Sequence, residues 1–251
     1  MRKIWIREIY ESQWKSKIMI IFFIAYSDSE NDSKGLFSSL FNESQQFRDL
    51  LVFKLNDHYR MSTWKILNFI RYCLLIYYSP NLEAQNCNQM LPIIAKMDED
   101  IVVFPDILIK IIEYLSHFSG QRFCAGQSSP SDYYKITRLK NEPQYIPYAV
   151  YSQNEIPSHY LTGFCYFISY PAAIDLYRYA KCMENLIFVD DYLITGFIRD
   201  KLKIPLIHLD NLVSPVKDFS NIAIVHGYPS FFLHNQKLVW NSARGSHGAV
   251  A

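Results

Sequence analysis

The chain has 251 residues, half of them hydrophobic and 20% charged, which fits one large domain or two small ones and excludes wholesale disorder. Its formal net charge of +1 argues against a broad nucleic-acid-binding surface, although a local basic patch would be compatible with it. Aromatic residues make up 16% of the chain, with 19 tyrosines, and such side chains either line carbohydrate or peptide clefts or form an ordinary core.

The first fifth of the chain predicts two strands with helices around them. Residues 1–14 combine basic and aromatic side chains at helical spacing and predict a short amphipathic helix. The apolar run up to residue 26 is about half the length of a membrane span, so residues 17–26 predict a buried strand. Residues 27–41 are rich in Ser, Asp and Asn and predict a surface loop. A helical stretch over 43–48 and a second strand over 50–55 follow.

The pattern of strands and helices continues to about residue 118. Residues 58–78 predict a long helix, 93–97 a buried strand, and 105–115 a helix whose first position is proline. Strands that alternate with helices indicate an α/β fold with a mostly parallel central sheet flanked by helices.

From Gly120 onward, strands and helices no longer alternate regularly in the predicted pattern. Four prolines interrupt residues 128–157 and predict irregular, extended chain. Residues 160–169 predict an aromatic strand, and Ser169 is placed to cap a helix that runs to Met183. Short apolar runs follow residue 204, and residues 241–251 lose any pattern and predict a frayed tail.

Cysteine usage excludes some small folds. None of the five cysteines forms a C-x-x-C pair, so the sequence supports neither a zinc ribbon nor a thioredoxin motif. Two glycosylation sequons, Asn31-Asp32-Ser33 and Asn42-Glu43-Ser44, mildly favour a lumenal protein. We expect any targeting segment or membrane anchor to lie outside this sequence.

The most informative local feature is Asp98-Glu99-Asp100, which follows the buried strand 93–97. Carboxylates at the end of a buried strand are costly unless something neutralises them. A bound Mg²⁺ or Mn²⁺ would do so, because hard cations prefer oxygen ligands. The alternative is a solvated acidic turn, since the tripeptide by itself is common.

Several further motifs occur in one order along residues 2–196. They are Arg2-Lys3-Ile4-Trp5-Ile6-Arg7, Asp49-Leu50-Leu51, Asp57-His58-Tyr59 with Thr63 and Lys65, Lys96-Met97-Asp98-Glu99-Asp100, the set Pro157, Tyr160, Gly163, Tyr166 and Ser169, and Asp190-Asp191-Tyr192 with Thr195-Gly196. In this order they resemble the inverting β1,3-galactosyl- and N-acetylglucosaminyltransferases of the Golgi, relatives of Fringe, and most of all the divergent nematode branch. The departures are Tyr10, Glu99, Phe164, Cys165 and Asp190.

The resemblance implies a single α/β domain of the GT-A type over residues 1–240, with a nucleotide-binding half at about 1–118 and an acceptor-side half at about 119–240. It implies a UDP-sugar donor, Mn²⁺, and a glycan acceptor on a glycoprotein or glycolipid. It also implies the Golgi lumen, with membrane attachment only through an anchor absent from this chain. We expect no nucleic-acid partner, because the net charge is low.

The resemblance also implies roles for single residues. Asp100 and Asp98 would hold the manganese ion, with His226 as a third ligand, although Asp98 could instead face the ribose. Asp191 would be the general base, and its alternative role is a helix cap. Arg2, Arg7, Asp49 and Lys65 would lie in the nucleotide-binding half, where a basic helix, a strand-end cap and a surface lysine are the alternatives. Gly163 would let a sugar approach closely, between Tyr160 and Tyr166, which would equally suit a core.

Two other functions stay open at this stage. A non-catalytic relative that binds a sugar or nucleotide would show neither donor hydrolysis nor transfer. An unrelated aromatic-rich α/β binding domain would lack a pocket that joins Asp98, Asp100 and Asp191.

Overall fold

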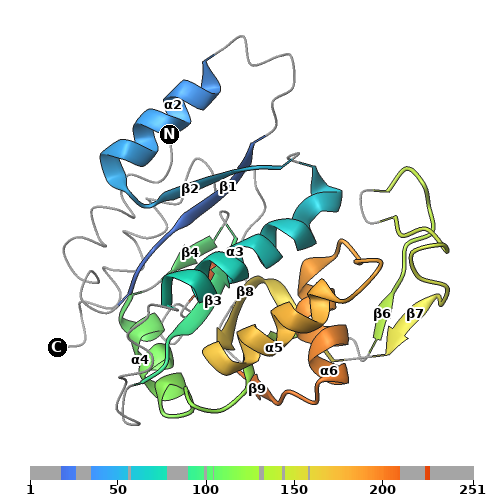
Figure 1. The fold of residues 1–251 in the computed structure, drawn as a ribbon. Coiled ribbons are helices and arrows are strands. Elements are labelled where there is room, and N and C mark those ends of the chain that lie inside the picture. The colour runs from blue at the N-terminus through green and yellow to red at the C-terminus, as the bar shows by residue number, and fades with distance from the viewer. Residues whose placement is uncertain are drawn as a thin grey trace. The chain divides into compact units, whose positions relative to one another are not determined.

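The computed structural model describes residues 18–26, 35–55, 58–77, 90–98, 101–103, 105–129, 133–142, 145–157, 159–209 and 224–226 (Figure 1). The chain divides into two compact units, Met1–Met61 and Ser62–Ala251. The helix predicted over residues 1–14 and the tail 241–251 lie outside the described residues. A single domain over 1–240 with its two halves stays a prediction.

The N-terminal unit contains a parallel strand pair joined through a helix. β1 (Phe22–Tyr26) pairs in parallel with β2 (Leu50–Lys54), and α2 (Leu36–Phe47) lies between them in the chain. Leu40 of α2 is buried in a small apolar cluster with Tyr26 and Leu50. Both strands predicted for this region are confirmed, although β1 covers only the second half of the predicted 17–26, while β2 ends one residue before the predicted 55.

The surface loop predicted over residues 27–41 is wrong from Leu36 onward, because α2 begins there. Gly35 precedes the helix with φ 64, and Arg48 ends it with φ 55 and donates its backbone N–H to the Ser44 carbonyl. Ser and Asn favour turns because their side chains compete for backbone groups. Burial of Leu40 against the strands overrides that preference here. Asn42 of the second sequon is an exposed residue within this helix.

The C-terminal unit is built on a four-stranded sheet in the order β3-β8-β5-β9. The strands are β3 (Ile93–Met97), β8 (Leu161–Ser169), β5 (Cys124–Ser128) and β9 (Leu206–His208). β8 runs antiparallel to both of its neighbours, whereas β5 and β9 are parallel. Three strands therefore share one direction, and β8 is inserted between two of them in reverse.

The predicted α/β class, with a central sheet flanked by helices, is confirmed. We expected a mostly parallel sheet. Three of its four strands do run in one direction, but β8 lies between two of them and pairs with both in antiparallel fashion. Parallel neighbours in a sheet need a crossover connection, usually through a helix. Among the described residues, the connection from β5 to β8 contains no helix, and β8 returns antiparallel to β5.

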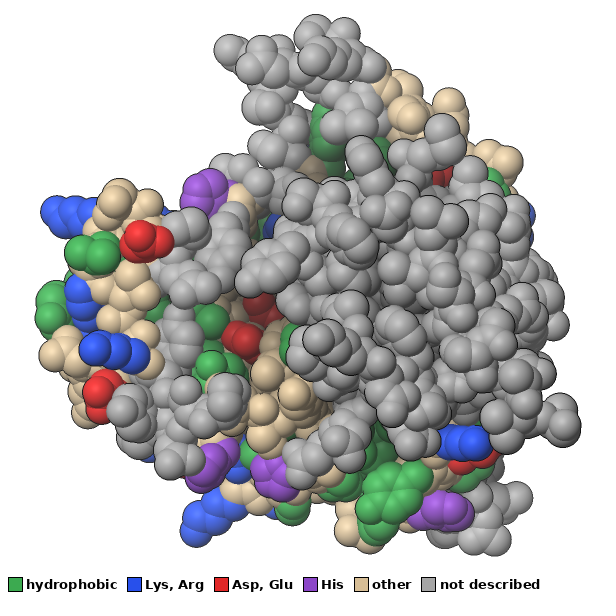
Figure 2. All heavy atoms as spheres, turned by 180° about the vertical axis from the view of Figure 1, so that it is seen from behind, with side chains coloured by type: hydrophobic (Ala, Val, Ile, Leu, Met, Phe, Trp, Pro, Cys, Tyr) green, Lys and Arg blue, Asp and Glu red, His purple; other side chains and the backbone are tan. Residues whose placement is uncertain are grey.

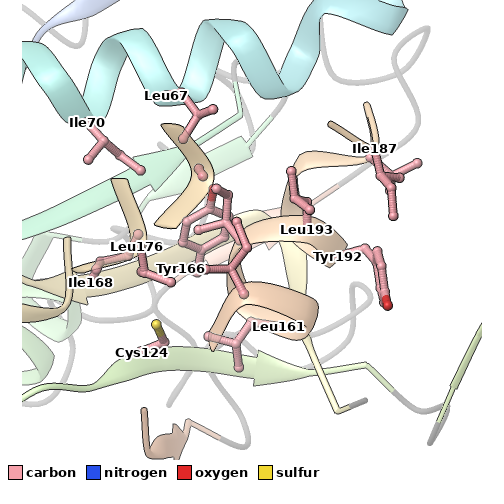
Figure 3. Close-up of a cluster of buried hydrophobic side chains, with 14 of the residues drawn as sticks. Leu67, Ile70, Cys124, Leu161, Tyr166, Ile168, Leu176, Ile187, Tyr192 and Leu193 are labelled. Atoms are coloured by element: carbon pink, nitrogen blue, oxygen red, sulfur yellow. The ribbon is translucent and has the colours of Figure 1, made fainter. Parts of the chain in front are cut away.

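Three helices pack around this sheet: α3 (Ser62–Tyr77), α4 (Pro105–Ser116) and α5 (Tyr170–Lys181). Figure 1 shows α3 and α5 on one side of the sheet, in front of β3 and β8. Leu67 and Ile70 of α3 point toward Tyr166 of β8 in the largest buried cluster (Figure 3). This apolar contact fixes α3 against the strand that carries Gly163.

The helix predicted after Ser169 is confirmed as α5, with proline in its first turn. Ser169 occupies the N-cap position, but its side chain makes no capping hydrogen bond. Its hydroxyl instead accepts the backbone N–H of Phe123 at 3.0 Å. The side chain therefore ties the start of α5 to the residue that precedes β5.

The remaining elements are short. β4 (Ile101–Val103) pairs antiparallel with β10 (Ile224–His226), and β6 (Tyr133–Lys135) with β7 (Glu155–Pro157). The latter pair lies in the region predicted to be irregular. Further helical turns are η2 (Tyr59–Met61), the π-helix η4 (Tyr192–Ile198) and α6 (Arg199–Lys201). No helix in the described part of the chain has the length and hydropathy needed to cross a membrane.

Candidate active site

The site begins at the carboxyl end of β3, where Asp98 follows the strand. Its backbone N–H donates to the Phe164 carbonyl at 2.9 Å. Lys96, two residues earlier, places its Nζ 2.5 Å from Asp98 Oδ1 and also donates to the Gly163 carbonyl. The antiparallel register of β3 and β8 thus brings Asp98, Lys96 and Gly163 together.

Gly163 is the point at which β8 meets Asp191. A Cβ atom on Gly163 would lie 2.9 Å from Asp191 Oδ2 and 3.2 Å from its Cγ. Real Cβ atoms do not approach an oxygen that closely, so a larger residue would displace the carboxylate. The space next to this glycine therefore accommodates the Asp191 carboxylate, a neighbour that the sequence did not indicate.

Asp191 is held from its own helix as well. Its Oδ1 accepts the backbone N–H of Tyr192 at 2.7 Å at the start of η4. Its carbonyl accepts the Thr195 hydroxyl at 2.6 Å. The cap and base interpretations of Asp191 are therefore compatible, because Oδ1 caps the helix while Oδ2 is directed at Gly163. π-Helical turns of this kind often occur at functional sites.

Burial and neighbouring charge raise the pKa of both adjacent carboxyls. Burial, followed by the charge of Asp190, raises the pKa of Asp191 from 3.8 to about 6, and the charge of Asp98 adds to it. Burial also raises the pKa of Asp190, while the ammonium of Lys96 opposes this shift. Asp190 Oδ2 is a buried oxygen without a hydrogen-bond partner among the described residues. The mutual influence of these charges places Asp98, Asp190 and Asp191 in one electrostatic cluster.

Lys96 supplies positive charge within this cluster. Burial by itself would lower the pKa of its ammonium, but the charges of Asp190, Asp98 and Asp191 outweigh burial and raise the pKa. Its side chain is only 12% exposed, and Nζ lies 5.7 Å from the centre of the Tyr166 ring. The lysine is therefore a buried counter-ion that links β3 to β8.

Replacing Lys96 by Met should lower the free energy of unfolding by about 1–3 kcal/mol at neutral pH. The substitution leaves Asp98 Oδ1 and the Gly163 carbonyl without this donor, in the presence of three carboxylates. Lys201→Met is the matched control, because Lys201 also lies 5.7 Å from an aromatic ring but is exposed. Urea denaturation checks both variants, and equal stability of the two would contradict the role given to Lys96.

Of the other predicted site residues, some lie outside the described part of the chain. These are Arg2, Arg7 and Asp100. The backbone of His226 lies in β10 opposite Ile101, the residue that follows Asp100 in the sequence. Asp49 precedes β2 in the N-terminal unit, and its carbonyl accepts the Phe22 N–H at 2.7 Å. Lys65 is a partly buried residue of α3.

The structure thus brings together three of the predicted residues, Asp98, Gly163 and Asp191. Sequence reasoning overlooked Lys96 and Asp190 as members of the site, although both stand inside the motifs that it used. Tyr166 is fully buried in the main core, which confirms the core account of this residue (Figure 3). Figure 2 shows acidic side chains next to hydrophobic ones on the face opposite to that of Figure 1.

None of the four described cysteines is disulfide-bonded. Cys124 and Cys165 lie inside the sheet, and burial raises the pKa of the Cys124 thiol to about 12. Burial likewise raises the pKa of the Cys165 thiol, on the strand that carries Gly163. Both thiols are therefore structural groups with little thiolate character.

A sequence profile of the family described as galactosyltransferase matches residues 1–210, which is most of the chain and includes Asp98, Gly163 and Asp191. The chain belongs to the galactosyltransferase family. This assignment confirms the resemblance on which the sequence interpretation rested, and it makes the unit around β3 and β8 part of a glycosyltransferase domain.

Within this family the chain is similar to beta-1,3-galactosyltransferase bre-2 of Caenorhabditis elegans. The two are 30% identical over 165 residues, which are 62% of this chain and 40% of the relative. The chain thus matches about two fifths of the relative's length. The β1,3-galactosyltransferase activity in this name is that of the relative.

Proposed function

We propose that this member of the galactosyltransferase family is an inverting hexosyltransferase. It moves galactose or an N-acetylhexosamine from a UDP-sugar to a hydroxyl of a glycan on a glycoprotein or glycolipid, in β1,3 linkage, within the Golgi lumen. The family match and the name of the relative support the class of reaction, sugar transfer. The observation that carries the proposal is Asp191, a carboxylate with a pKa of about 6 whose Oδ2 is directed at Gly163 beside Asp98.

In this proposal Asp191 is the general base. Its carboxylate takes the proton of the acceptor hydroxyl while the hydroxyl oxygen bonds to the anomeric carbon of the donor sugar. The bond between that carbon and the diphosphate oxygen breaks, and UDP leaves with the electron pair. A base is most effective when its pKa lies near the working pH, and the environment of Asp191 moves its pKa in that direction.

The residue types proposed as ligands, two carboxylates and an imidazole, would suit a hard divalent cation. Asp98 ends a strand with its side chain 41% exposed, and Lys96 engages its Oδ1. The β4–β10 register sets the backbone of His226 opposite the residue after Asp100. Asp100, Asp98 and His226 would hold Mn²⁺, which would neutralise charge on the leaving diphosphate. Because Lys96 already neutralises Asp98, we propose Asp100 as the main Mn²⁺ ligand. Asp98 would be a second ligand or a contact to the ribose.

The predicted nucleotide contacts of Arg2, Arg7, Asp49 and Lys65 belong to this proposal. A guanidinium group binds a diphosphate through charge-assisted hydrogen bonds, and a carboxylate can accept from a ribose hydroxyl. Asp49 and Lys65 lie in the two different compact units.

The pH dependence of transfer should report Asp191. Transfer should fall as the pH is lowered through about 6, because the protonated carboxyl cannot accept the acceptor proton. The measurement is kcat/KM for the acceptor over a pH series, with circular dichroism at each pH to exclude unfolding. A rate that stays constant from neutral pH to well below the pKa of Asp191 would contradict its role as the base.

Calorimetry with UDP tests the donor site. The wild-type chain should bind UDP only in the presence of Mn²⁺, and Asp100→Ala should abolish that binding because it removes the main proposed ligand. Asp175→Ala is the control, since Asp175 pairs with Arg122 on the surface. Absence of binding in a well-folded wild-type sample would refute the active transferase. Binding without transfer would instead favour a non-catalytic relative.

A further inference from the structure

In the segment that leads into Asp190 and Asp191, the carbonyls of Ile187 and Phe188 accept hydrogen bonds from side chains. Ile187, Phe188 and Val189 are buried, and they lie outside the described helices and strands. A buried carbonyl in such a segment needs a donor from elsewhere, because no ladder supplies one. The donors here come from the first turn of α3.

Two consecutive hydroxyl groups of α3 serve this segment. Thr63 Oγ1 donates to the Ile187 carbonyl at 2.6 Å, and Ser62 Oγ donates to the Phe188 carbonyl. Thr63 is 1% exposed, so water does not compete for its hydroxyl. The residue pairs are more than 120 positions apart in the sequence, and the contact therefore fixes a tertiary arrangement.

A third hydroxyl holds the other side of the carboxylate pair. Thr195 Oγ1 donates to the Asp191 carbonyl and accepts the Leu161 N–H at 2.9 Å. Asp190 and Asp191 thus lie between anchors from α3 and an anchor from η4 that is tied to β8. A backbone held on both sides leaves the Asp191 carboxylate little freedom to move away from Gly163.

We propose that Ser62 and Thr63 are positioning residues that orient Asp191 through the backbone of Ile187 and Phe188. The inference rests on the proposed function, because it takes Asp191 as the base. A displacement of about 1 Å between a base and its substrate can reduce a rate by about 100-fold. Neither hydroxyl has to touch the substrate for this effect.

Thr63 gives the cleaner test of the two. The one hydroxyl hydrogen of Ser62 is shared between two acceptors, the Phe188 carbonyl and the Asp190 side chain. Thr63 bonds the Ile187 carbonyl, and Val has nearly its shape without the hydroxyl. Thr63→Ser keeps the hydroxyl and loses only the methyl group. Thr162→Val is a matched control, since Thr162 donates to the Gln127 carbonyl at 3.2 Å across the sheet, outside the segment 187–191.

The experiment measures kcat and donor KM with whichever of UDP-galactose, UDP-N-acetylglucosamine and UDP-N-acetylgalactosamine the wild type uses, and Mn²⁺–UDP binding by calorimetry. Thr63→Val should lower kcat by about 10-fold or more with unchanged UDP affinity. Thr63→Ser and Thr162→Val should stay within about twofold of the wild type. Ser62→Ala should also lower kcat. This second variant keeps the test decisive if Thr63→Val folds poorly.

A readout without turnover separates this inference from the proposed function. Carbon-detected NMR titration of the Asp191 carboxyl should show its pKa moving toward the ordinary value in Thr63→Val and unchanged in Thr63→Ser. An unchanged pKa in Thr63→Val, or an equal loss of kcat in both Thr63 variants, would overturn the inference. A wild type that binds no UDP would refute the proposed donor site, and the titration would still decide the role of Thr63.

Discussion

Replacing Asp191 by Asn should lower the rate of sugar transfer by roughly 100- to 10,000-fold and leave Mn²⁺-dependent UDP binding unchanged. The amide cannot take the acceptor proton, but its oxygen can still accept the Tyr192 N–H that caps η4. The loss should therefore fall on kcat and not on the affinity for the donor. Steady-state kinetics and calorimetry on the same samples measure the two quantities.

The same variant should be more stable than the wild type at neutral pH. The folded pKa of Asp191 is raised from 3.8 to about 6, so the folded state holds the proton more tightly than the unfolded state does. The free energy of unfolding then falls as the pH rises from about 4 through about 6. Above that range the folded state keeps the full cost of ionising the Asp191 carboxyl. Asn removes this cost, which is roughly 1–3 kcal/mol at about 1.4 kcal/mol per unit of pKa shift.

Asp175→Asn is the control for both effects. It neutralises an aspartate that pairs with Arg122 on the surface, and it should change neither the rate nor the pH dependence of stability appreciably. Asp191→Asn with transfer within a few fold of the wild type would remove Asp191 from the mechanism. A stability that still falls between pH 4 and 6 in Asp191→Asn would assign the pH dependence to another carboxyl, with Asp190 the first candidate.

Gly163→Ala should reduce transfer by roughly 100-fold through the displacement of Asp191, since a base moved by about 1 Å loses that much. The new methyl would lie 2.9 Å from Oδ2 and 3.3 Å from Cβ of Asp191, and Oδ1 is fixed by the Tyr192 N–H. The carboxylate therefore has to rotate. It would then lose its hydrogen bond with the Tyr192 N–H, or Oδ2 would no longer be directed at Gly163. UDP binding should persist, because Asp98 follows β3, the other strand of the pair.

Two glycines provide controls of different severity. Gly120→Ala meets no atom within 4 Å and should leave activity and stability near the wild type. Gly126→Ala meets the Cys165 carbonyl at 3.2 Å and the Tyr166 Cβ at 3.3 Å in the same sheet, away from Asp191. If Gly126→Ala lost as much kcat as Gly163→Ala, the effect would reflect strain in the sheet in general. Only a selective loss in Gly163→Ala supports the specific contact with Asp191.

The local elements were predictable because their signals are local. The apolar run 93–97 and proline at 105 indicated β3 and α4, and both elements formed at those positions. Motif order indicated Asp98 and Asp191 as separate site residues. The prediction failed at α2, where the burial of Leu40 outweighs a polar composition that is typical of a loop.

The arrangement of the site was not predictable from spacing, because it depends on the direction of one strand. β8 is antiparallel to β3, and this reversal sets Gly163 next to Lys96 and thereby joins Asp98 to Asp191. If β8 were parallel to β3, Gly163 would lie next to the amino-terminal end of β3, away from Lys96 and Asp98. Likewise, the hydroxyl contacts from α3 to Ile187 and Phe188 link residues more than 120 positions apart, which no local pattern can show.

The most direct test of the account is the product of a transfer reaction with defined donors. The chain is incubated with Mn²⁺, each of the three UDP-sugars, and a panel of β-galactoside and β-N-acetylhexosaminide acceptors, and the product is analysed by NMR. We expect the wild type to form a β1,3-linked product from an α-linked donor, and Asp191→Asn to form none. A product with retained α configuration, or UDP binding without any product or donor hydrolysis, would contradict an inverting transferase that uses Asp191.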